Sequence, residues 1–585
     1  MRKILIGLFG TCWLLVTFAA LAGMYHLWWQ RERVLYFGKT VEQQRKVVFQ
    51  RAGLPTGLAD KVNFLARQWP SAIRYKASGD ATSLSYIQYL LLPRIPAENA
   101  SHTLQVKGDD FLFTSGSSDQ QFTDSVDTNN PVGLIFSFFI LTGWAVLLRQ
   151  LWRNMPTWPE SFALSCFFLT LLTLPIRFFF YSVNMAFSGA VMFGIIGWIT
   201  TIFNYFRKEK RIGCSEKIKG ALFALFYGKK KGERLFVALL LGIIFAAIFW
   251  TFIMSVVVVP DDWDAWAIWG SKAKVLAQGT GPLHDLTGFG HSDYPLLWPT
   301  VWAFSAWLSG GWEECWSKGW GAVFLFFCVW EIILIVKKQS RCLTTGLLTG
   351  ALFVSIPNIP LLASWSYAEA PLWLMMICGL GCFLRQQNKK NKGDAVLIGL
   401  FAAAAAYTKN EGVLFAVILG ALLFGSSRRW QATAIYALTF TGCYLGWWYW
   451  SRIYYDLGSH ATAGLHFDAH MLLRAAKRIP PACEAIFGMW KDIRQWNIIG
   501  FGIIITMFWA LFKIRREKRR LLFLLLPISL LSGYFIIIIF HPGEIYWQIG
   551  TAWNRLTVQV LPLLLILLVP IVLEDQQVEL KINKQ

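Results

Sequence analysis

The stretch "LFVALLLGIIFAAIFWTFIMSVVVVP" (235–260) decides the fold class, because it is apolar and long enough to cross a lipid bilayer as one helix. It runs without a break into "DDWDAWAIWGSKAK" (261–274), which carries three aspartates, three tryptophans and two lysines. Charged groups are costly beside lipid, whereas tryptophan is enriched at the membrane surface. The junction therefore indicates a membrane-spanning helix that ends at the membrane surface, in a stretch rich in charged residues.

The composition of the chain points to the same class. Of its 585 residues, 55% are hydrophobic and 15% are charged, whereas a soluble domain has about 45–50% and about 25%. The net charge of +21 fits basic cytoplasmic loops, so we expect a lipid bilayer and no nucleic acid as partner. The sequence contains no P-loop, G-x-S-x-G or H-E-x-x-H motif, so ATP hydrolysis, serine-triad and zincin chemistry have no support.

Basic clusters set the predicted orientation. The segment 206–234 is strongly basic and is assigned to the cytoplasm, and counting the apolar runs then places the later basic clusters on the same side. We predict an all-α polytopic membrane protein with about 14 transmembrane helices and both termini cytoplasmic. The segment 295–311 is too short to span comfortably, and we interpret it as a surface or re-entrant helix.

The chain divides into five segments on this interpretation. Residues 1–28 are expected to be a retained anchor rather than a signal peptide, because their apolar run exceeds the usual signal core. Residues 29–130 are polar and combine helical periodicity with an expected hairpin in "HTLQVKGDDFLFTSG", which predicts a small extracytoplasmic α+β domain. The remaining segments are additional helices with a basic loop (131–233), a transmembrane core (234–573) and a cytoplasmic tail (574–585).

The opening acidic stretch lies on the predicted outer side. A carboxylate that is partly removed from water has a raised pKa and suits a general base, so the candidates are Asp261, Asp262 and Asp264. Lys272 and Lys274 follow on the same presumed helix and are candidates for binding a phosphate. The simpler interpretation is a salt-bridged juxtamembrane helix with an aromatic belt, and the residue types alone leave both open.

Four further stretches place polar residues near the same surface: "HSDYPLLWP" (291–299), "SWSYAEAPLWL" (364–374), "AYTKNEGVLF" (406–415) and "NRLTVQVLP" (554–562). Ionisable groups at such depth are candidates for function. The simpler interpretations are a helix N-cap for Asp293, a loop ion pair for Lys409 with Glu411, and a snorkelling side chain for Arg555.

Together these stretches resemble the GT-C superfamily of membrane glycosyltransferases, which includes protein O-mannosyltransferases and the aminoarabinose transferases of lipid A. The resemblance lies in the apolar span before "DDWDAW", in "HSDYP", in "YAEAPL", and in "TKNEG" and "NRLTVQVLP", and it covers roughly 234–573. It implies a GT-C-like core in the bacterial inner membrane. In simpler members the acidic loop follows the first span, whereas here four spans and the 29–130 domain precede it.

The resemblance implies transfer of a sugar from a polyprenyl-phosphate-linked donor to a lipid, glycan or protein acceptor on the outer face, with no nucleotide site. It implies Asp264 or Asp262 as the general base. The donor phosphate would be bound by Arg555, Lys409, Lys272 and Lys274. The pocket for sugar and acceptor would be shaped by His291, Asp293, Tyr294, Glu369 and Glu411. No cofactor is certain; some members bind a divalent cation, for which Asp262 with Glu369 is the candidate pair.

Two other function classes stay open. A transporter or flippase for a lipid-linked or small solute shares polytopic helices and buried charges, but transporters often show two related halves. Here "DDWDAW" and "HSDYP" each occur once and the external loops 260–318 and 451–497 are long, which favours the enzyme. The third class is a non-catalytic envelope scaffold that docks through residues 29–130.

Overall fold

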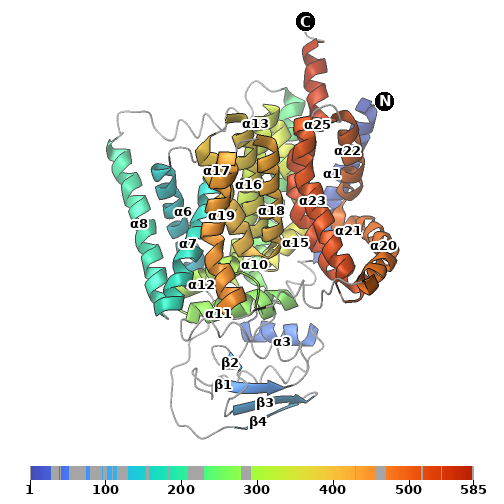
Figure 1. Cartoon of the computed structure of the whole chain (residues 1–585). Helices are drawn as coiled ribbons and strands as arrows, with labels where there is room; N and C mark the ends of the chain where they lie inside the picture. Colours follow the sequence, from blue (N-terminus) through green and yellow to red (C-terminus); the bar gives the residue numbers. More distant parts are fainter. Residues whose placement is uncertain are drawn as a thin grey trace.

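The computed structural model describes eighteen stretches of the chain: residues 2–27, 39, 41–51, 74–78, 95–96, 102–107, 110–114, 130–152, 157–180, 183–207, 230–278, 291–389, 391–427, 430–454, 457, 469–514, 518–541 and 543–582. Within them the protein is a helical bundle with one small sheet (Figure 1). Figure 1 places the two chain ends at one end of the bundle and the sheet beyond the other.

Seven segments of the described chain are long and apolar enough to cross a membrane, so the protein is a polytopic helical membrane protein. They fall on the helices α6 (Val132–Leu151), α7 (Trp158–Phe180), α8 (Val183–Arg207), α10 (Lys231–Val257), α13 (Trp320–Ser340), α23 (Lys518–Phe540) and α25 (Asn554–Ile582). Large apolar side chains of α8, such as Ile199 and Phe203, are exposed on the bundle, as expected of a surface that faces lipid.

The remaining bundle helices are shorter or carry more charge. They are α16 (Glu369–Lys389), α17 (Lys392–Thr408), α18 (Glu411–Ser427), α19 (Trp430–Trp448) and α22 (Ile499–Ile514). The apolar run at 343–363 predicts a single span, but the structure divides it into α14 (Leu343–Val354) and α15 (Asn358–Ser364), which meet at an angle of 67°. The break falls at Pro357, because a proline disfavours helical backbone in the residue before it.

The first helix, α1 (Arg2–Leu27), is hydrogen-bonded to this break. Trp13 Nε1 donates to Ser355 Oγ at 2.9 Å. Asn497 follows the short helix α21 (Ile493–Trp496) and is fully buried. Its amide nitrogen donates to Thr17 Oγ1 at 3.0 Å and to the Ser355 carbonyl at 3.1 Å. These contacts integrate α1 into the bundle.

A four-stranded sheet lies beyond one end of the bundle (Figure 1). Its order is β2 (Ile95–Pro96), β1 (Arg74–Ser78), β3 (His102–Lys107) and β4 (Asp110–Thr114). The expected hairpin in this region is present, since β3 and β4 pair antiparallel with Lys107 opposite Asp110. Helix α3 (Val41–Arg51) lies between the sheet and the bundle. Most of segment 29–130 lies outside the described residues, so the α+β domain stays a prediction.

Helix α3 is docked onto the segment that leads into the acidic stretch. The side-chain oxygen of Gln44 accepts a hydrogen bond from the Val259 backbone N–H at 3.1 Å. Arg45 forms an ion pair with Glu314 at 2.7 Å, and both side chains are buried. The two contacts fix α3 over the start and the end of the loop that holds the candidate site.

The segment 295–311 contains α12 (Leu297–Leu308), a helix of 12 residues. This is about 18 Å of helix, less than the hydrocarbon thickness of a bilayer. Residues 297–306 are all buried, and α12 packs against α6, α7 and α11 (Ser271–Gln278). A short helix at this depth is tolerated because protein covers it.

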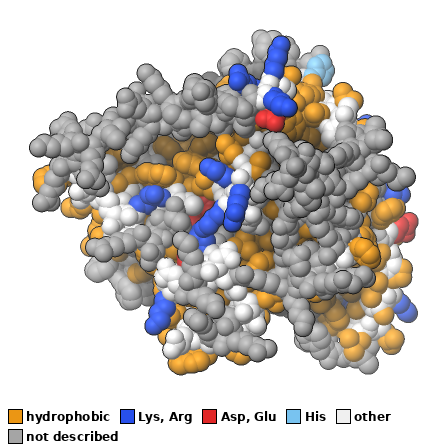
Figure 2. Space-filling view, turned by 90° about the horizontal axis from the view of Figure 1, so that it is seen from above, with side chains coloured by type: hydrophobic (Ala, Val, Ile, Leu, Met, Phe, Trp, Pro, Cys, Tyr) orange, Lys and Arg blue, Asp and Glu red, His pale blue; other side chains and the backbone are white. Residues whose placement is uncertain are grey.

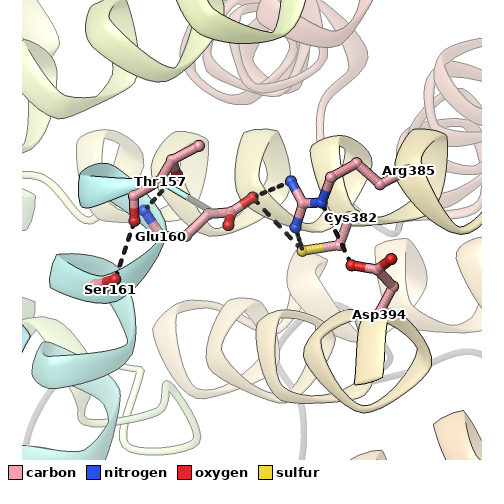
Figure 3. A network of polar contacts seen from close by, with 6 residues as sticks. All are labelled: Thr157, Glu160, Ser161, Cys382, Arg385 and Asp394. Carbon is pink, nitrogen blue, oxygen red and sulfur yellow. Dashed lines mark hydrogen bonds and ion pairs between the residues drawn. The ribbon is translucent and has the colours of Figure 1, made fainter. Parts of the chain in front are cut away.

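A buried ion-pair network joins the start of α7 to the end of α16 and the start of α17 (Figure 3). Arg385 Nη1 donates to Glu160 Oε1 at 2.5 Å, and Arg385 Nε donates to Asp394 Oδ1 at 3.3 Å. Glu160 is fully buried and its backbone N–H donates to Thr157 Oγ1 at 3.2 Å. The network therefore attaches α7 to α16 and α17.

Replacing Arg385 by methionine is expected to lower the free energy of unfolding by about 3–5 kcal/mol, because Glu160 would stay buried without its cation. Thermal unfolding of the purified full chain in detergent would measure this. Lys337→Met, which removes an exposed cation at the end of α13, should leave the transition unchanged. Equal transitions for the two variants would contradict the role of the network.

Basic side chains gather at the end of the bundle that carries the two chain termini, as the view from above shows (Figure 2). Exposed cations in this part of the structure include Lys230, Lys231 and Arg234 at the start of α10, Lys337 and Arg341 at the end of α13, and Lys392 at the start of α17. Because α10 ends just before Asp261 and α13 begins just after Glu314, the acidic stretch lies at the other end.

Candidate functional site

The acidic stretch begins a buried turn of helix. After α10 the chain is extended through Val258, and the Asp262 carbonyl then accepts hydrogen bonds from the backbone N–H groups of Ala265 and Trp266 at 3.1 and 3.4 Å. The following residues form a π-helical segment, η2 (Ala265–Gly270), in which every residue is buried. Asp262 and Asp264 are therefore held by a rigid element, and their carboxylates lie at its edge.

Asp264 is paired with Arg555 across 291 residues of sequence. Arg555 Nη1 donates to Asp264 Oδ2, and both side chains keep partial exposure. The Arg555 guanidinium also lies 5.1 Å from the centre of the Tyr367 ring. The first residues of α25, the acidic stretch and the loop before α16 thus meet in one place. Arg555 makes an ion pair here instead of snorkelling alone toward water.

Asp262 accepts a hydrogen bond from the Tyr367 hydroxyl. Burial raises the pKa of Asp262 above the usual range of an aspartate. The Tyr367 hydrogen bond opposes this rise in pKa, whereas the neighbouring carboxylates of Asp264 and Asp261 add to it. Asp262 is thus a stronger base than an aspartate in water.

Lys409 is the centre of a second charged group. Its Nζ lies 2.9 Å from Glu369 Oε1 and 3.1 Å from Glu411 Oε1, so the expected pair with Glu411 is present and Glu369 joins it. Burial alone would lower the pKa of Lys409, but the two carboxylates hold it above its ordinary value. The turn requires Gly412, because a Cβ there would lie 2.1 Å from the Ala405 backbone.

Asp293 does not cap a helix. The N-cap of α12 is Leu296, and it makes no side-chain capping bond. The Asp293 carboxylate is buried and turned toward the α17–α18 turn, where Asn410 Nδ2 donates to it at 2.7 Å. Arg452, in the π-helical segment η5 (Tyr449–Tyr454) that follows α19, lies 3.7 Å from the same oxygen. The capping prediction failed because a tertiary partner from another turn takes this carboxylate.

Lys272 is fully buried and binds the "HSDY" turn. Its Nζ donates to the His291 carbonyl at 2.5 Å and to the Tyr294 carbonyl at 3.2 Å. Burial lowers the pKa of Lys272 to about 7, although Asp293 acts in the opposite direction. The Tyr294 ring stacks on His291 and on Trp269, with ring centres 4.9 and 5.3 Å apart. Lys272 thus stabilises the turn from His291 to Tyr294.

The other candidate lysine, Lys274, lies beside Trp312. Lys274 is buried, with its Nζ 5.9 Å from the centre of the Trp312 ring. The structure therefore directs both lysines of the opening stretch toward protein groups. Their binding of a phosphate stays a prediction.

Several polar residues of the site were missed in the sequence analysis. Tyr367 lies two residues before Glu369 in "SYAEA", and Asn410 lies directly before Glu411 in "TKNEG". Their nearness to these acidic residues could have identified them as site residues. Ser366 has a positive φ of 64°, an uncommon conformation for a residue other than glycine, and its carbonyl accepts from Trp298 Nε1 at 2.7 Å. Arg452 belongs to none of the quoted stretches, and no local pattern marks it.

No metal centre is formed by the described residues, where no group of three or more His, Cys, Asp or Glu is placed to hold an ion. Of the candidate pair, Asp262 is bound by Tyr367 and Glu369 by Lys409. The arrangement joins a carboxylate of raised pKa, an arginine and a paired lysine at one end of the bundle.

Searches against protein-family models, curated proteins and solved structures found no match to this chain.

Proposed function

We propose that the protein is a GT-C-type membrane glycosyltransferase that moves a sugar from a polyprenyl-phosphate donor to an envelope acceptor. The observation that carries this proposal is the meeting of Asp262, Asp264 and Arg555 at the end of the bundle. Glycosyl transfer from a lipid phosphate needs a base for the acceptor and a cation for the departing phosphate. These three side chains supply both beside apolar helices.

The structure favours different roles for the two aspartates. Asp262 is the better candidate for the general base, since burial raises its pKa toward neutrality. Asp264 is ion-paired and would orient Arg555, whose planar guanidinium binds phosphate oxygens in two places at once. Lys409 lies within electrostatic reach of Arg555 and adds positive charge near the same position.

The reaction then proceeds as a displacement at the anomeric carbon. The acceptor's hydroxyl or amine gives its proton to the Asp262 carboxylate and forms a new bond to that carbon. The bond between the anomeric carbon and the phosphate oxygen breaks, and the oxygen keeps the electron pair. Polyprenyl phosphate leaves, with its developing negative charge stabilised by Arg555.

The proposal includes the full topology of about 14 spans. The basic end of the bundle would face the cytoplasm of a bacterium, because lysine and arginine are enriched in cytoplasmic loops. The Asp262–Arg555 end would then face outward from the inner membrane, where a lipid, glycan or protein acceptor is available. Segment 29–130 would lie outside, above the site.

A transporter for a lipid-linked solute is the second candidate. The broken pair α14–α15 and the buried Lys409–Glu369 ion pair favour it, since broken helices and buried charges are common in transporters. Transport leaves the bond between sugar and phosphate intact, whereas transfer breaks it. The fate of the donor therefore separates the two functions.

The test is a transfer assay with the full chain in liposomes. Undecaprenyl phosphate bearing a labelled sugar is supplied together with an extract of envelope acceptors. Transfer predicts label in the acceptor fraction and an equal amount of free undecaprenyl phosphate, both absent from liposomes without protein. Intact donor that only changes leaflet would replace the proposal by transport. Envelope glycans from a deletion strain, compared by mass with the parent, would identify the sugar.

A further inference from the structure

A group of buried polar atoms lies below the ion-paired residues. Gln559 on α25 is fully buried, and neither atom of its amide has a hydrogen-bond partner within the described chain. The same is true there of the Tyr534 hydroxyl on α23, which is 1% exposed, and of Glu411 Oε2 on α18. Buried polar groups in proteins are nearly always hydrogen-bonded, so three such groups indicate bound water or a ligand.

Helix geometry places Gln559 beneath Arg555. The two residues are four apart on α25, so they share one face, and Gln559 lies about 6 Å deeper. Helix α25 packs against α16 and α23, the helices that carry Glu369 and Tyr534. The Gln559 amide therefore lies on the inner side of the site.

Close packing of α23 on α18 places Tyr534 beside Glu411. A Cβ on Gly533 would lie 2.7 Å from the Leu414 side chain, so α23 approaches α18 at this glycine. Leu414 is one turn after Glu411, and Tyr534 follows Gly533 directly. The charges of Glu411, Lys409 and Glu369 all act on the Tyr534 hydroxyl. Tyr534 and Glu411 thus border the same space.

The chemistry of these groups fits sugar hydroxyls. A carboxylate oxygen accepts a hydrogen bond, a phenol donates and accepts, and a carboxamide does both. Neighbouring hydroxyl groups of a sugar need such a mixture. Arg555 lies one turn before Gln559 on α25, and Lys409 lies 3.1 Å from Glu411, so both cations border this group and suit the phosphate to which the sugar is attached.

We infer that Gln559, Tyr534 and Glu411 form the pocket that binds the hydroxyl groups of the donor sugar, on the membrane side of Arg555. The inference rests on the proposed function and adds to it the residues that select the sugar. The sugar points into the bundle and its phosphate lies nearer the outer surface. Gln559 and Tyr534 act in specificity and take no part in bond breaking.

The test measures binding to the full chain in lipid nanodiscs by native mass spectrometry. The probes are bare undecaprenyl phosphate and undecaprenyl phosphate bearing glucose, mannose or arabinose. The wild-type protein should bind one sugar-bearing probe at least about tenfold more tightly than the bare lipid. Gln559→Met and Tyr534→Phe should each reduce this ratio about tenfold and leave the affinity for bare lipid unchanged.

Two matched controls remove buried hydroxyls that are bonded elsewhere. Thr557 on α25 donates to the Trp553 carbonyl at 2.9 Å, and Tyr436 on α19 donates to the Ala416 carbonyl at 2.6 Å. Thr557→Val and Tyr436→Phe should keep the wild-type preference for the sugar. Thermal unfolding of all four variants would show that each is folded.

The outcomes separate the inference from the proposed function. A wild-type preference that survives in both Gln559→Met and Tyr534→Phe would overturn the pocket and assign these atoms to internal water. Equal binding of bare and sugar-bearing lipid by the wild-type protein would also overturn it, while leaving lipid-phosphate binding in place. Binding of none of the four probes would overturn the proposed function and the pocket together.

Discussion

Replacing Asp262 by asparagine is expected to lower sugar transfer by about 10²–10⁴-fold, the usual contribution of a general base. Asparagine is close in size and can still accept the Tyr367 hydrogen bond, so the protein should insert and fold normally. The amide cannot take a proton from the acceptor. The measurement is kcat/KM for the acceptor in liposomes with saturating donor.

The pH dependence of the reaction gives a second readout for Asp262. A base must be ionised to act, so kcat/KM of the wild-type protein should rise with pH through the pKa of Asp262. Burial raises that pKa, so the rise should occur above the usual range of an aspartate. The residual activity of Asp262→Asn should lack this rise.

An exposed carboxylate on helix α20 supplies the matched control for Asp262. Glu484→Gln on helix α20 (Ala469–Trp490) makes the same chemical change at an exposed position. It should retain full transfer. Wild-type rates in Asp262→Asn would remove the base from the proposed mechanism, and Asp264→Asn would then be the next variant to measure.

Arg555→Ala is expected to have the second large effect. Loss of a cation that stabilises developing negative charge typically costs about 10²–10³-fold in kcat. Loss of a charged hydrogen bond to the donor phosphate should also raise the apparent KM for the donor by about tenfold or more. Asp264 would lose its partner at the same time, so its orienting contact would be lost as well. The measurement is kcat and KM over a range of donor concentrations.

One variant separates charge from geometry at Arg555, and a second variant at another arginine is its control. Arg555→Lys keeps the positive charge but cannot bind two phosphate oxygens through a planar fork, so it should recover only part of kcat. Arg494→Ala removes an exposed arginine of α21 near the same surface and should behave as the wild-type protein. An unchanged donor KM in Arg555→Ala would count against binding of the phosphate.

The class of fold was predictable from the sequence because apolar run length and charge position act locally. The run at 235–260 is helix α10, and the short segment at 295–311 contains the buried helix α12. The break between α14 and α15 was missed, because the run around Pro357 is apolar on both sides and hydropathy does not register backbone angle. The position of Pro357 within the run could have predicted the break.

The residues of the site were easier to predict than their partners. Asp262, Glu369 and Lys409 stand out because charge is rare near apolar runs. Their pairing depends on how distant helices pack, and Asp264 and Arg555 are 291 residues apart. Asp293 shows the consequence, since a local rule assigned it to a helix cap and Asn410 of another turn binds it instead. Local patterns identify candidates, and tertiary packing decides their roles.

The contacts of α1 have a consequence for biosynthesis. Thr17 lies near the start of the chain, and its partner Asn497 comes 480 residues later. At a synthesis rate of about 5–20 residues per second, roughly 25–95 s separate the emergence of the two residues from the ribosome. During that interval α1 can already bond to Ser355 through Trp13, but Thr17 lacks its partner. A ribosome that stalls before Asn497 therefore leaves a nascent protein in which the Thr17 hydroxyl and the Ser355 carbonyl lack the amide that joins them in the complete fold.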